Sequence, residues 1–284
     1  MSRLLLATDL DRTLLPNGAA PESPRARERF AHLAAHPDVT LVYVTGRDPG
    51  RVDEAIATWE VPRPDALIAD VGATIAGPGP GGWERWPGWD EAIAPDWGGH
   101  DASDLAALLQ GEPGLAELRL QDPSRQGRWK LSFEVAPDGP LPQLAGLIRD
   151  RLAASGVRAG VIFSRDDALG VGLVDVLPAS ADKHRALEFV MARLGFGLGE
   201  TVFAGDSGND LEVLAGPVPA VLVANASPEL QAIARREADA AGHGDLLYLA
   251  RGGLPGLNGN YAAGILEGVL HYHPAWAAHI KESA

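Results

Sequence analysis

The feature that most constrains this chain is a short apolar run that ends in two acidic residues. Leu4–Thr8 has the composition of a buried strand, and Asp9, Asp11 and Thr13 follow it at alternate positions. In an extended chain such positions project to the same side. Two carboxylates held that close repel each other, so the site needs a proton or a cation. Because ligands bind where the strands of a parallel α/β sheet end, the run predicts both a fold class and the place of a site.

Apolar strands alternate with helical patterns towards both ends of the chain. Helical patterns at 24–35 and 53–59 flank a β-branched run at 39–45, and a short strand follows at 66–69. The alternation returns later, with helices expected at 183–194, 210–214 and the second half of 256–270, and strands at 201–204 and 221–223. This order predicts an α/β protein with a Rossmann-like, doubly wound core.

The middle of the chain has a different pattern. A glycine and proline cluster at 77–82 is typical of a domain boundary or a hairpin tip, and four tryptophans follow it within 83–97. Helices are expected near 102–109 and 141–154, and strands near 115–121, 129–135, 161–164 and 172–177. We therefore expect an inserted α+β domain at 81–169, within a core formed by 1–80 and 170–284.

The composition excludes several classes of function. The chain has 284 residues and a net charge of −14, which disfavours nonspecific binding to nucleic acid or to an anionic membrane. It has no cysteine, so disulfides, thiolate metal sites and cysteine nucleophiles are excluded. The first residues lead straight into the first strand, and no apolar run reaches transmembrane length. We expect a cytoplasmic monomer that acts on a small molecule.

Polar groups occur at three more places where an apolar strand ends or a helix begins. Thr45, Gly46 and Arg47 follow one strand, Lys183 opens a helix, and a glycine-rich acidic segment at 205–210 follows another strand. Exposed backbone amides at such places suit a phosphate group. Each motif alone has a simpler explanation, as a helix-capping turn or a surface lysine.

The acidic segment adds Asp206 and Asp210 to Asp9 and Asp11, so four carboxylates would face one crevice. One lysine cannot balance four acids. A hard divalent cation with oxygen ligands can, and magnesium is the usual choice beside a phosphate. The residues therefore predict a site for Mg²⁺ and a phosphate group.

The four motifs, in this order, resemble those of the haloacid dehalogenase superfamily of phosphatases. The insertion between the second and third motifs resembles the larger, type-two cap of that superfamily. Further segments resemble the sucrose-phosphate phosphatase family, at 68–75, 129–133, 174–178, 225–230 and 261–267. Arg12 departs from that family, which often has asparagine there, and so does His184, where glycine is usual. Most of the insertion, from 83 to 126, does not align, which leaves the identity of the sugar open.

The resemblance implies a role for each core residue. Asp9 is the expected nucleophile, and Asp11 the general acid and base. The expected Mg²⁺ ligands are the carboxylates of Asp9 and Asp206, the backbone carbonyl of Asp11, and Asp210 directly or through water. The expected phosphate contacts are Thr45, the Gly46 amide, Lys183 and Asn209. A neighbouring acid would raise the pKa of Asp11 and a metal would lower it, and the sequence leaves the outcome open.

A sugar requires hydrogen-bond donors and often an aromatic face. We expect Lys130, beside Trp129, and Arg47 to contact it. The predicted activity is Mg²⁺-dependent hydrolysis of sucrose 6-phosphate through an aspartyl-phosphate. Mannosylfructose phosphate, glucosylglycerol phosphate and mannosylglycerate phosphate remain alternative substrates. A sugar phosphomutase and a non-catalytic sugar-phosphate sensor remain alternative functions.

Overall fold

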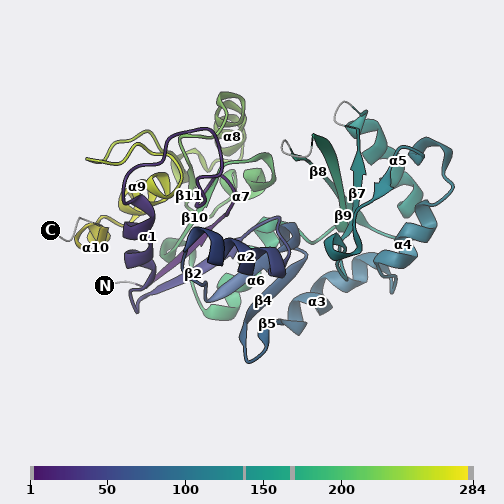
Figure 1. Ribbon diagram of the computed structural model, residues 1–284, viewed down its shortest axis with the longest axis horizontal. Coiled ribbons are helices and arrows are strands. Elements are labelled where there is room, and N and C mark those ends of the chain that lie inside the picture. Colours follow the sequence, from purple (N-terminus) through teal and green to yellow (C-terminus); the bar gives the residue numbers. More distant parts are fainter. Residues whose placement is uncertain (1–2, 137–138, 167–169, 281–284) are drawn as a thin grey trace. The chain divides into compact units, whose positions relative to one another are not determined.

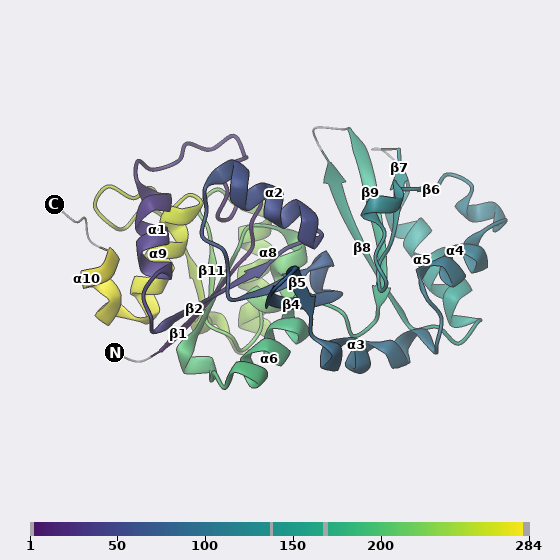
Figure 2. The same ribbon diagram turned by 60° about the horizontal axis from the view of Figure 1, so that its bottom comes forward.

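The computed structural model describes residues 3–136, 139–166 and 170–280. The chain divides into two compact units. The first unit contains the chain up to Gly72, Ala76–Glu84, and the chain from Lys183 onward. The second contains Ala73–Ile75 and Arg85–Asp182. Each unit has its own sheet, with helices packed against it (Figures 1 and 2).

The first unit contains an eight-stranded sheet with the order β12-β11-β10-β1-β2-β3-β4-β5, except for the first two residues of β4 and the last residue of β5 (Figure 1). Its strands are β1 Leu4–Thr8, β2 Val39–Val44, β3 Ala66–Ala69, β4 Thr74–Gly79, β5 Gly82–Arg85, β10 Thr201–Gly205, β11 Ala220–Leu222 and β12 Leu247–Leu249. Neighbours from β12 to β3 pair in parallel, and every residue of β1 is buried. The predicted doubly wound α/β core is confirmed, because apolar β-branched runs of this kind suit strands covered on both faces.

Helices cover this sheet on both faces (Figure 1). They are α1 Ala26–Ala34, α2 Pro49–Trp59, α6 Lys183–Leu194, α7 Leu211–Leu214, α8 Pro228–Ala240, α9 Ala262–Tyr272 and α10 Ala277–Ile280. α1 packs against α9, which also lies on β10 and β11, whereas α6 packs against α7 and β3. Among the described residues, no helix combines the length and the apolar character that crossing a membrane requires.

The start of α2 and the presence of α8 differ most from the sequence prediction. α2 begins at Pro49, four residues before the predicted start, because the Asp48 side chain accepts a hydrogen bond from the Arg51 amide and proline fits the first helical turn. α8 was not predicted. It begins after Ser227, whose hydroxyl accepts a hydrogen bond from the Leu230 amide at 3.2 Å. Both starts rest on local caps rather than on apolar periodicity.

The second unit has a four-stranded antiparallel sheet with the order β6-β7-β9-β8 (Figure 2). Its strands are β6 Arg119–Leu120, β7 Leu131–Val135, β8 Ala159–Asp166 and β9 Val171–Pro178. Its helices are α3 Pro87–Ile93, α4 Ala102–Leu109 and α5 Leu141–Ala153, and α5 packs against β8 and α4. From α4 onward the helix and strand order is the predicted one, and α3 is an addition.

Two details of the middle region differ from the prediction, and a third decides between two predicted alternatives. The strand expected at 115–121 is only β6, because the chain at Pro113–Leu115 forms a 3-10 turn that buries Leu115. The cluster at 77–82, predicted to be a domain boundary or a hairpin tip, is the tip of the β4–β5 hairpin. Residues 170–182, assigned to the core from sequence, belong to the second unit, because β9 pairs along its length with β7 and β8.

Candidate active site

The polar motifs meet where three neighbouring strands end. Asp9 follows β1, Thr45 follows β2, and Asp206 follows β10. Thr8 lies opposite Tyr43 on one side and Ala204 on the other, so the three strands end at the same edge of the sheet. The connections run outward from β1 towards β3 on one side and from β10 towards β12 on the other. A crevice at such a reversal is the usual place for a ligand in this class of fold.

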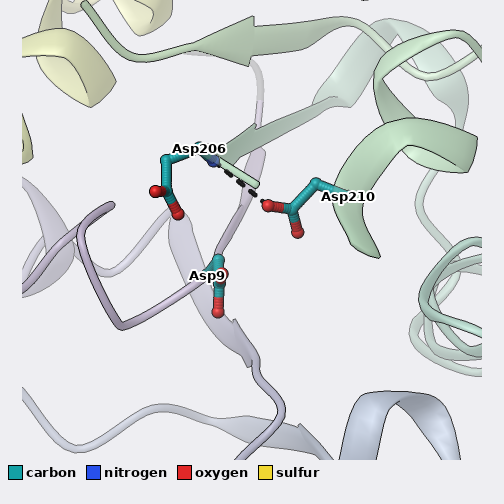
Figure 3. Close-up of side chains that lie close together, drawn as sticks. All are labelled: Asp9, Asp206 and Asp210. Atoms are coloured by element: carbon teal, nitrogen blue, oxygen red, sulfur yellow. Dashed lines mark hydrogen bonds between the residues drawn. The ribbon is translucent and has the colours of Figure 1, made fainter. Parts of the chain in front are cut away.

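Three aspartates form a buried cluster at this edge. Carboxylate oxygens of Asp9, Asp206 and Asp210 all lie within 4.8 Å of one another, and all three residues are buried. Figure 3 shows them side by side, with the Asp206 amide donating a hydrogen bond to Asp210 Oδ2 at 3.1 Å. The Leu10 amide donates to Asp9 Oδ1 at 2.7 Å. The sequence prediction that these acids share one site agrees with this geometry.

Burial makes this cluster electrostatically costly. It raises the pKa of Asp9 well above the ordinary value; Lys183 opposes the shift and the neighbouring aspartates add to it. Burial, followed by the charge of Asp210, raises the pKa of Asp206 to about 7. The three acids can be ionised together only when a bound cation balances their charge, which is typical of a cation site.

Lys183 is the only cation inside the cluster among the described residues. It is the first residue of α6, and its Nζ lies 3.3 Å from Asp9 Oδ2 and 2.7 Å from Asp210 Oδ1. Burial lowers its pKa, but the two carboxylates more than offset that effect, so its pKa lies above the ordinary value. Lys183 therefore stays charged and balances one of the three acids.

The turn after β10 fixes Asp210. Its Oδ2 accepts hydrogen bonds from the amides of Asp206 and Ser207 at 3.1 and 3.0 Å. A Cβ atom at Gly205 would lie 2.6 Å from this carboxylate, so only glycine allows the side chain to approach the strand so closely. Asn209 is half-buried in the same turn, and its Oδ1 accepts from the Ser207 hydroxyl at 2.8 Å.

Asp11 has a different environment. Arg47 donates to both of its oxygens, from Nε at 2.8 Å and from Nη2 at 2.6 Å, and Asn17 Nδ2 donates at 2.6 Å. Burial raises the pKa of Asp11, but these donors lower it by more, so the net shift is downward. The sequence left this outcome open and assigned Arg47 to the sugar. Here Arg47 is the partner of Asp11.

Asp206 has two side-chain partners to which no role was assigned from the sequence. Thr13 Oγ1 donates to Asp206 Oδ1 at 3.1 Å, and Arg12 Nε lies 3.3 Å from Asp206 Oδ2. The Arg12 backbone is itself held, because its amide donates to Asn17 Oδ1 at 2.8 Å and its carbonyl accepts from Asn225 Nδ2 at 2.6 Å. Two features of the sequence could have indicated these partners. Arg12 departs from the family pattern, and Asn225 lies in a segment that resembles the family.

Thr45 is fully buried in the loop after β2. Its hydroxyl accepts a hydrogen bond from the Arg47 amide at 3.2 Å, and its carbonyl accepts one from the Val71 amide at 3.0 Å. Val71 has a φ of 58°, a strained conformation for a β-branched residue, and the hydrogen bond ties this strained turn to the Thr45 loop. Gly46, between Thr45 and Arg47, is half-buried.

The predicted sugar contact Lys130 lies in the second unit, just before β7, and is only 8% exposed. Its neighbour Trp129 is also buried and packs edge to face on Trp97, with the ring centroids 5.5 Å apart. Trp83, in the first unit, donates from Nε1 to Asp53 at 3.0 Å. These tryptophans have packing roles within their own units.

A profile of the sucrose-6F-phosphate phosphohydrolase family matches residues 2–273. The chain belongs to this family. It is therefore a phosphoric monoester hydrolase of the haloacid dehalogenase superfamily, as the four motifs predicted.

Several relatives are similar over nearly the whole chain. A HAD-like hydrolase of Nitrosococcus oceani is 45% identical over 96% of this chain and 74% of its own length. Sucrose-phosphatase 1 of Nicotiana tabacum is 28% identical over 96% of this chain, which spans only 60% of the tobacco protein. Among solved structures, the sucrose-phosphatase of Synechocystis in complex with sucrose and phosphate matches with a TM-score of 0.72 and 26% identity, covering 96% of this chain and 98% of that one.

Proposed function

We propose that this chain is a Mg²⁺-dependent sugar-phosphate phosphatase with sucrose 6-phosphate as its preferred substrate. The observation that carries the proposal is the buried cluster of Asp9, Asp206 and Asp210 around a single lysine, in a chain of this family. The similarity to a sucrose-phosphatase that binds sucrose and phosphate supports the choice of sugar.

The donor set fits magnesium. All three side chains offer carboxylate oxygens, which are the ligands that this ion prefers, and with Asp11 the site has four carboxylates against three cations. Asp9 and Asp206 would hold the ion through their carboxylates, with the Asp11 carbonyl and with Asp210 directly or through water. Bound there, Mg²⁺ would neutralise charge on the phosphoryl oxygens and orient them.

The proposed reaction proceeds in two steps on the chain's own residues. An Asp9 oxygen attacks phosphorus, the bond from phosphorus to the sugar oxygen breaks, and Asp11 gives that oxygen a proton. Asp11 then takes a proton from a water molecule that attacks the aspartyl-phosphate, which releases phosphate and restores Asp9. Because Arg47 holds both oxygens of Asp11, the acid can donate a proton only once that contact has loosened.

The phosphoryl group would be held by four groups near the strand ends. These are the Thr45 hydroxyl, the Gly46 amide, Lys183 and the Asn209 side chain. Phosphoryl transfer depends mainly on positioning and charge stabilisation, so this set is chemically sufficient. The second unit would act as the cap that distinguishes one sugar from another, with Lys130 as its first candidate contact.

The test is a phosphate-release assay with and without MgCl₂, on sucrose 6-phosphate and on the phosphates of mannosylfructose, glucosylglycerol and mannosylglycerate. We expect Mg²⁺-dependent release, fastest from sucrose 6-phosphate. Stoichiometric phosphate without an isomeric sugar phosphate would exclude a phosphomutase. No Mg²⁺-dependent hydrolysis of any of the four compounds would favour a sugar-phosphate sensor and overturn the proposal.

Asp9→Asn tests the nucleophile in the same assay. We expect turnover to fall by at least about a thousandfold, since the covalent route is lost, while circular dichroism and the melting temperature show a folded protein. Asp150→Asn, which changes an exposed aspartate on α5, is the matched control and should retain full activity. An Asp9→Asn variant with a near wild-type rate would remove Asp9 from its assigned role.

A further inference from the structure

Arg12 is the one cation in direct contact with Asp206 among the described residues, and its guanidinium Nε lies 3.3 Å from Asp206 Oδ2. Resting on the metal site proposed above, we infer that Arg12 tunes this site: it weakens binding of the divalent cation and strengthens binding of the phosphate dianion. Arg12 would act through Asp206 and would need no contact with the sugar.

The contact is built by the backbone rather than left to a flexible side chain. Arg12 has a φ of 57°, in the left-handed region that arginine rarely adopts. Two asparagines hold it there, with Asn17 accepting from its amide at 2.8 Å and Asn225 donating to its carbonyl at 2.6 Å. Asn225 also accepts from the Tyr261 amide at 2.8 Å, which ties the loop to the start of α9. Conformational strain of this kind is often found at functional positions.

Arg12 pairs with Asp206, whereas Lys183 lies between Asp9 and Asp210. The Arg12 side chain is 52% exposed, and that of Lys183 is completely buried. Loss of Lys183 would leave buried carboxylates unpaired, which is a structural defect. Loss of Arg12 would leave Asp206 with the Thr13 hydroxyl as a donor and would open the space that the half-exposed Arg12 side chain occupies. Arg12 is therefore the cation that can be removed without removing the fold.

The balance of charge shows which ligand Arg12 favours. The site has four carboxylates and three cations, and so carries one net negative charge when all are ionised. A divalent cation changes this to one positive charge, which attracts a phosphate dianion. Without Arg12 the site would carry two negative charges before the metal binds and none afterwards. The groups counted are Asp9, Asp11, Asp206, Asp210, Lys183, Arg47 and Arg12.

Arg12→Asn removes the charge and keeps the backbone, because asparagine tolerates positive φ better than other residues except glycine. Arg12→Lys keeps a positive charge. Arg25→Asn is a matched control, because Arg25 also has a positive φ, 61°, and a half-exposed side chain, yet its carboxylate partner is Glu28 at 2.9 Å. Together the three variants distinguish the effect of a positive charge beside Asp206 from the effects of backbone strain and of the overall charge of the protein.

The first measurement is Mn²⁺ binding without substrate, by electron paramagnetic resonance or titration calorimetry. We expect Arg12→Asn to bind Mn²⁺ roughly three- to tenfold more tightly, a range that reflects solvent screening of a half-exposed charge. With saturating Mn²⁺, titration calorimetry should show inorganic phosphate binding weakened by a similar factor. Arg12→Lys should bind Mn²⁺ and phosphate almost as the wild type does. Arg25→Asn should show neither change.

Unchanged or weaker Mn²⁺ binding in Arg12→Asn would overturn the inference, and so would an equal change in Arg25→Asn. If Arg12→Asn does not fold, Arg12→Gln carries the same expectation. If the wild-type protein binds Mn²⁺ and releases phosphate from its substrate, and Arg12→Asn binds Mn²⁺ with the same affinity, this inference alone is refuted. A wild-type protein that binds no Mn²⁺ would refute the metal site of the proposed function, and this inference with it.

Discussion

The two units bury carboxylates in opposite ways. In the first, Asp9 and Asp206 lie among other acids, and burial raises the pKa of both. In the second, Asp96 is 1% exposed but accepts hydrogen bonds from the Ser180 amide at 2.6 Å and from the Arg158 side chain. Burial raises the pKa of Asp96, and these donors lower it by more. An acid supplied with donors stabilises a fold, whereas a cluster short of cations indicates a ligand site.

The largest effect should come from Lys183→Met, which removes the only cation buried between Asp9 and Asp210 in the described chain. Breaking such a pair leaves uncompensated buried charge, so we expect the metal-free first unit to lose about 3–5 kcal/mol of stability. Mg²⁺ should restore part of this loss but not activity. Urea unfolding with and without Mg²⁺ measures it, with hydrogen exchange of β1 and β10 as the local probe.

The second unit provides the internal control for this experiment. Its sheet contains neither Lys183 nor the acidic cluster, so hydrogen exchange of β7 and β9 at low urea should not change in Lys183→Met. Equal loss of protection in both sheets would mean that the units unfold together, and the comparison between them would then fail. No loss of stability at all would mean that the acids are protonated or paired in some other way.

The next effect is a pH dependence of opposite sign in the two units. The pKa of Asp206 is about 7 in the folded, metal-free protein and returns to its ordinary acidic value on unfolding. The folded state therefore binds the proton more tightly, so the first unit should gain stability as pH falls from about 7 to about 4. The pKa of Asp96 is lowered by folding, so its contribution is present above about 4 and is lost as pH falls below that.

Hydrogen exchange of metal-free protein, corrected for the intrinsic pH effect, distinguishes the two sheets. Saturating Mg²⁺ should remove the pH dependence of the first unit, because the ion stabilises the ionised acids. Asp96→Asn should abolish the loss of stability of the second unit at low pH and should leave the stability of the first unit unchanged. A first unit that loses stability between pH 7 and pH 4 without metal would contradict the raised pKa values.

Much of the first unit could be predicted from sequence, since its strands are apolar runs whose ends carry recognisable motifs. β3 and α6 begin and end at the predicted residues, and Asp9, Asp206 and Asp210 come together as expected. α8 was missed because its starting signal is a local cap and its sequence is largely polar, although Ala234 and Ala238 lie at helical spacing and are buried.

The arginine partners could not be predicted. Arg47 reaches Asp11, and Arg12 reaches Asp206, across large separations in the sequence. Which side chain meets which carboxylate depends on the tertiary arrangement of loops, and no spacing rule encodes it. The second unit was harder for a related reason. Its edge strand β6 has two exposed residues, so no apolar run marks its limits.

The smallest effect concerns the aromatic core of the second unit. Trp97 and Trp129 pack edge to face, and in the part of the chain that the structure describes neither buried indole N–H has a hydrogen-bond partner. Trp129→Phe removes an unpaired donor along with some ring area, so we expect a loss of at most about 1.5 kcal/mol. Trp129→Ala creates a cavity and should cost about 3–5 kcal/mol. Urea unfolding of both variants measures these losses. If Trp129→Phe loses as much stability as Trp129→Ala, the indole N–H of Trp129 makes a stabilising contact. The second unit would then also contain a buried polar group that binds a ligand or a water molecule.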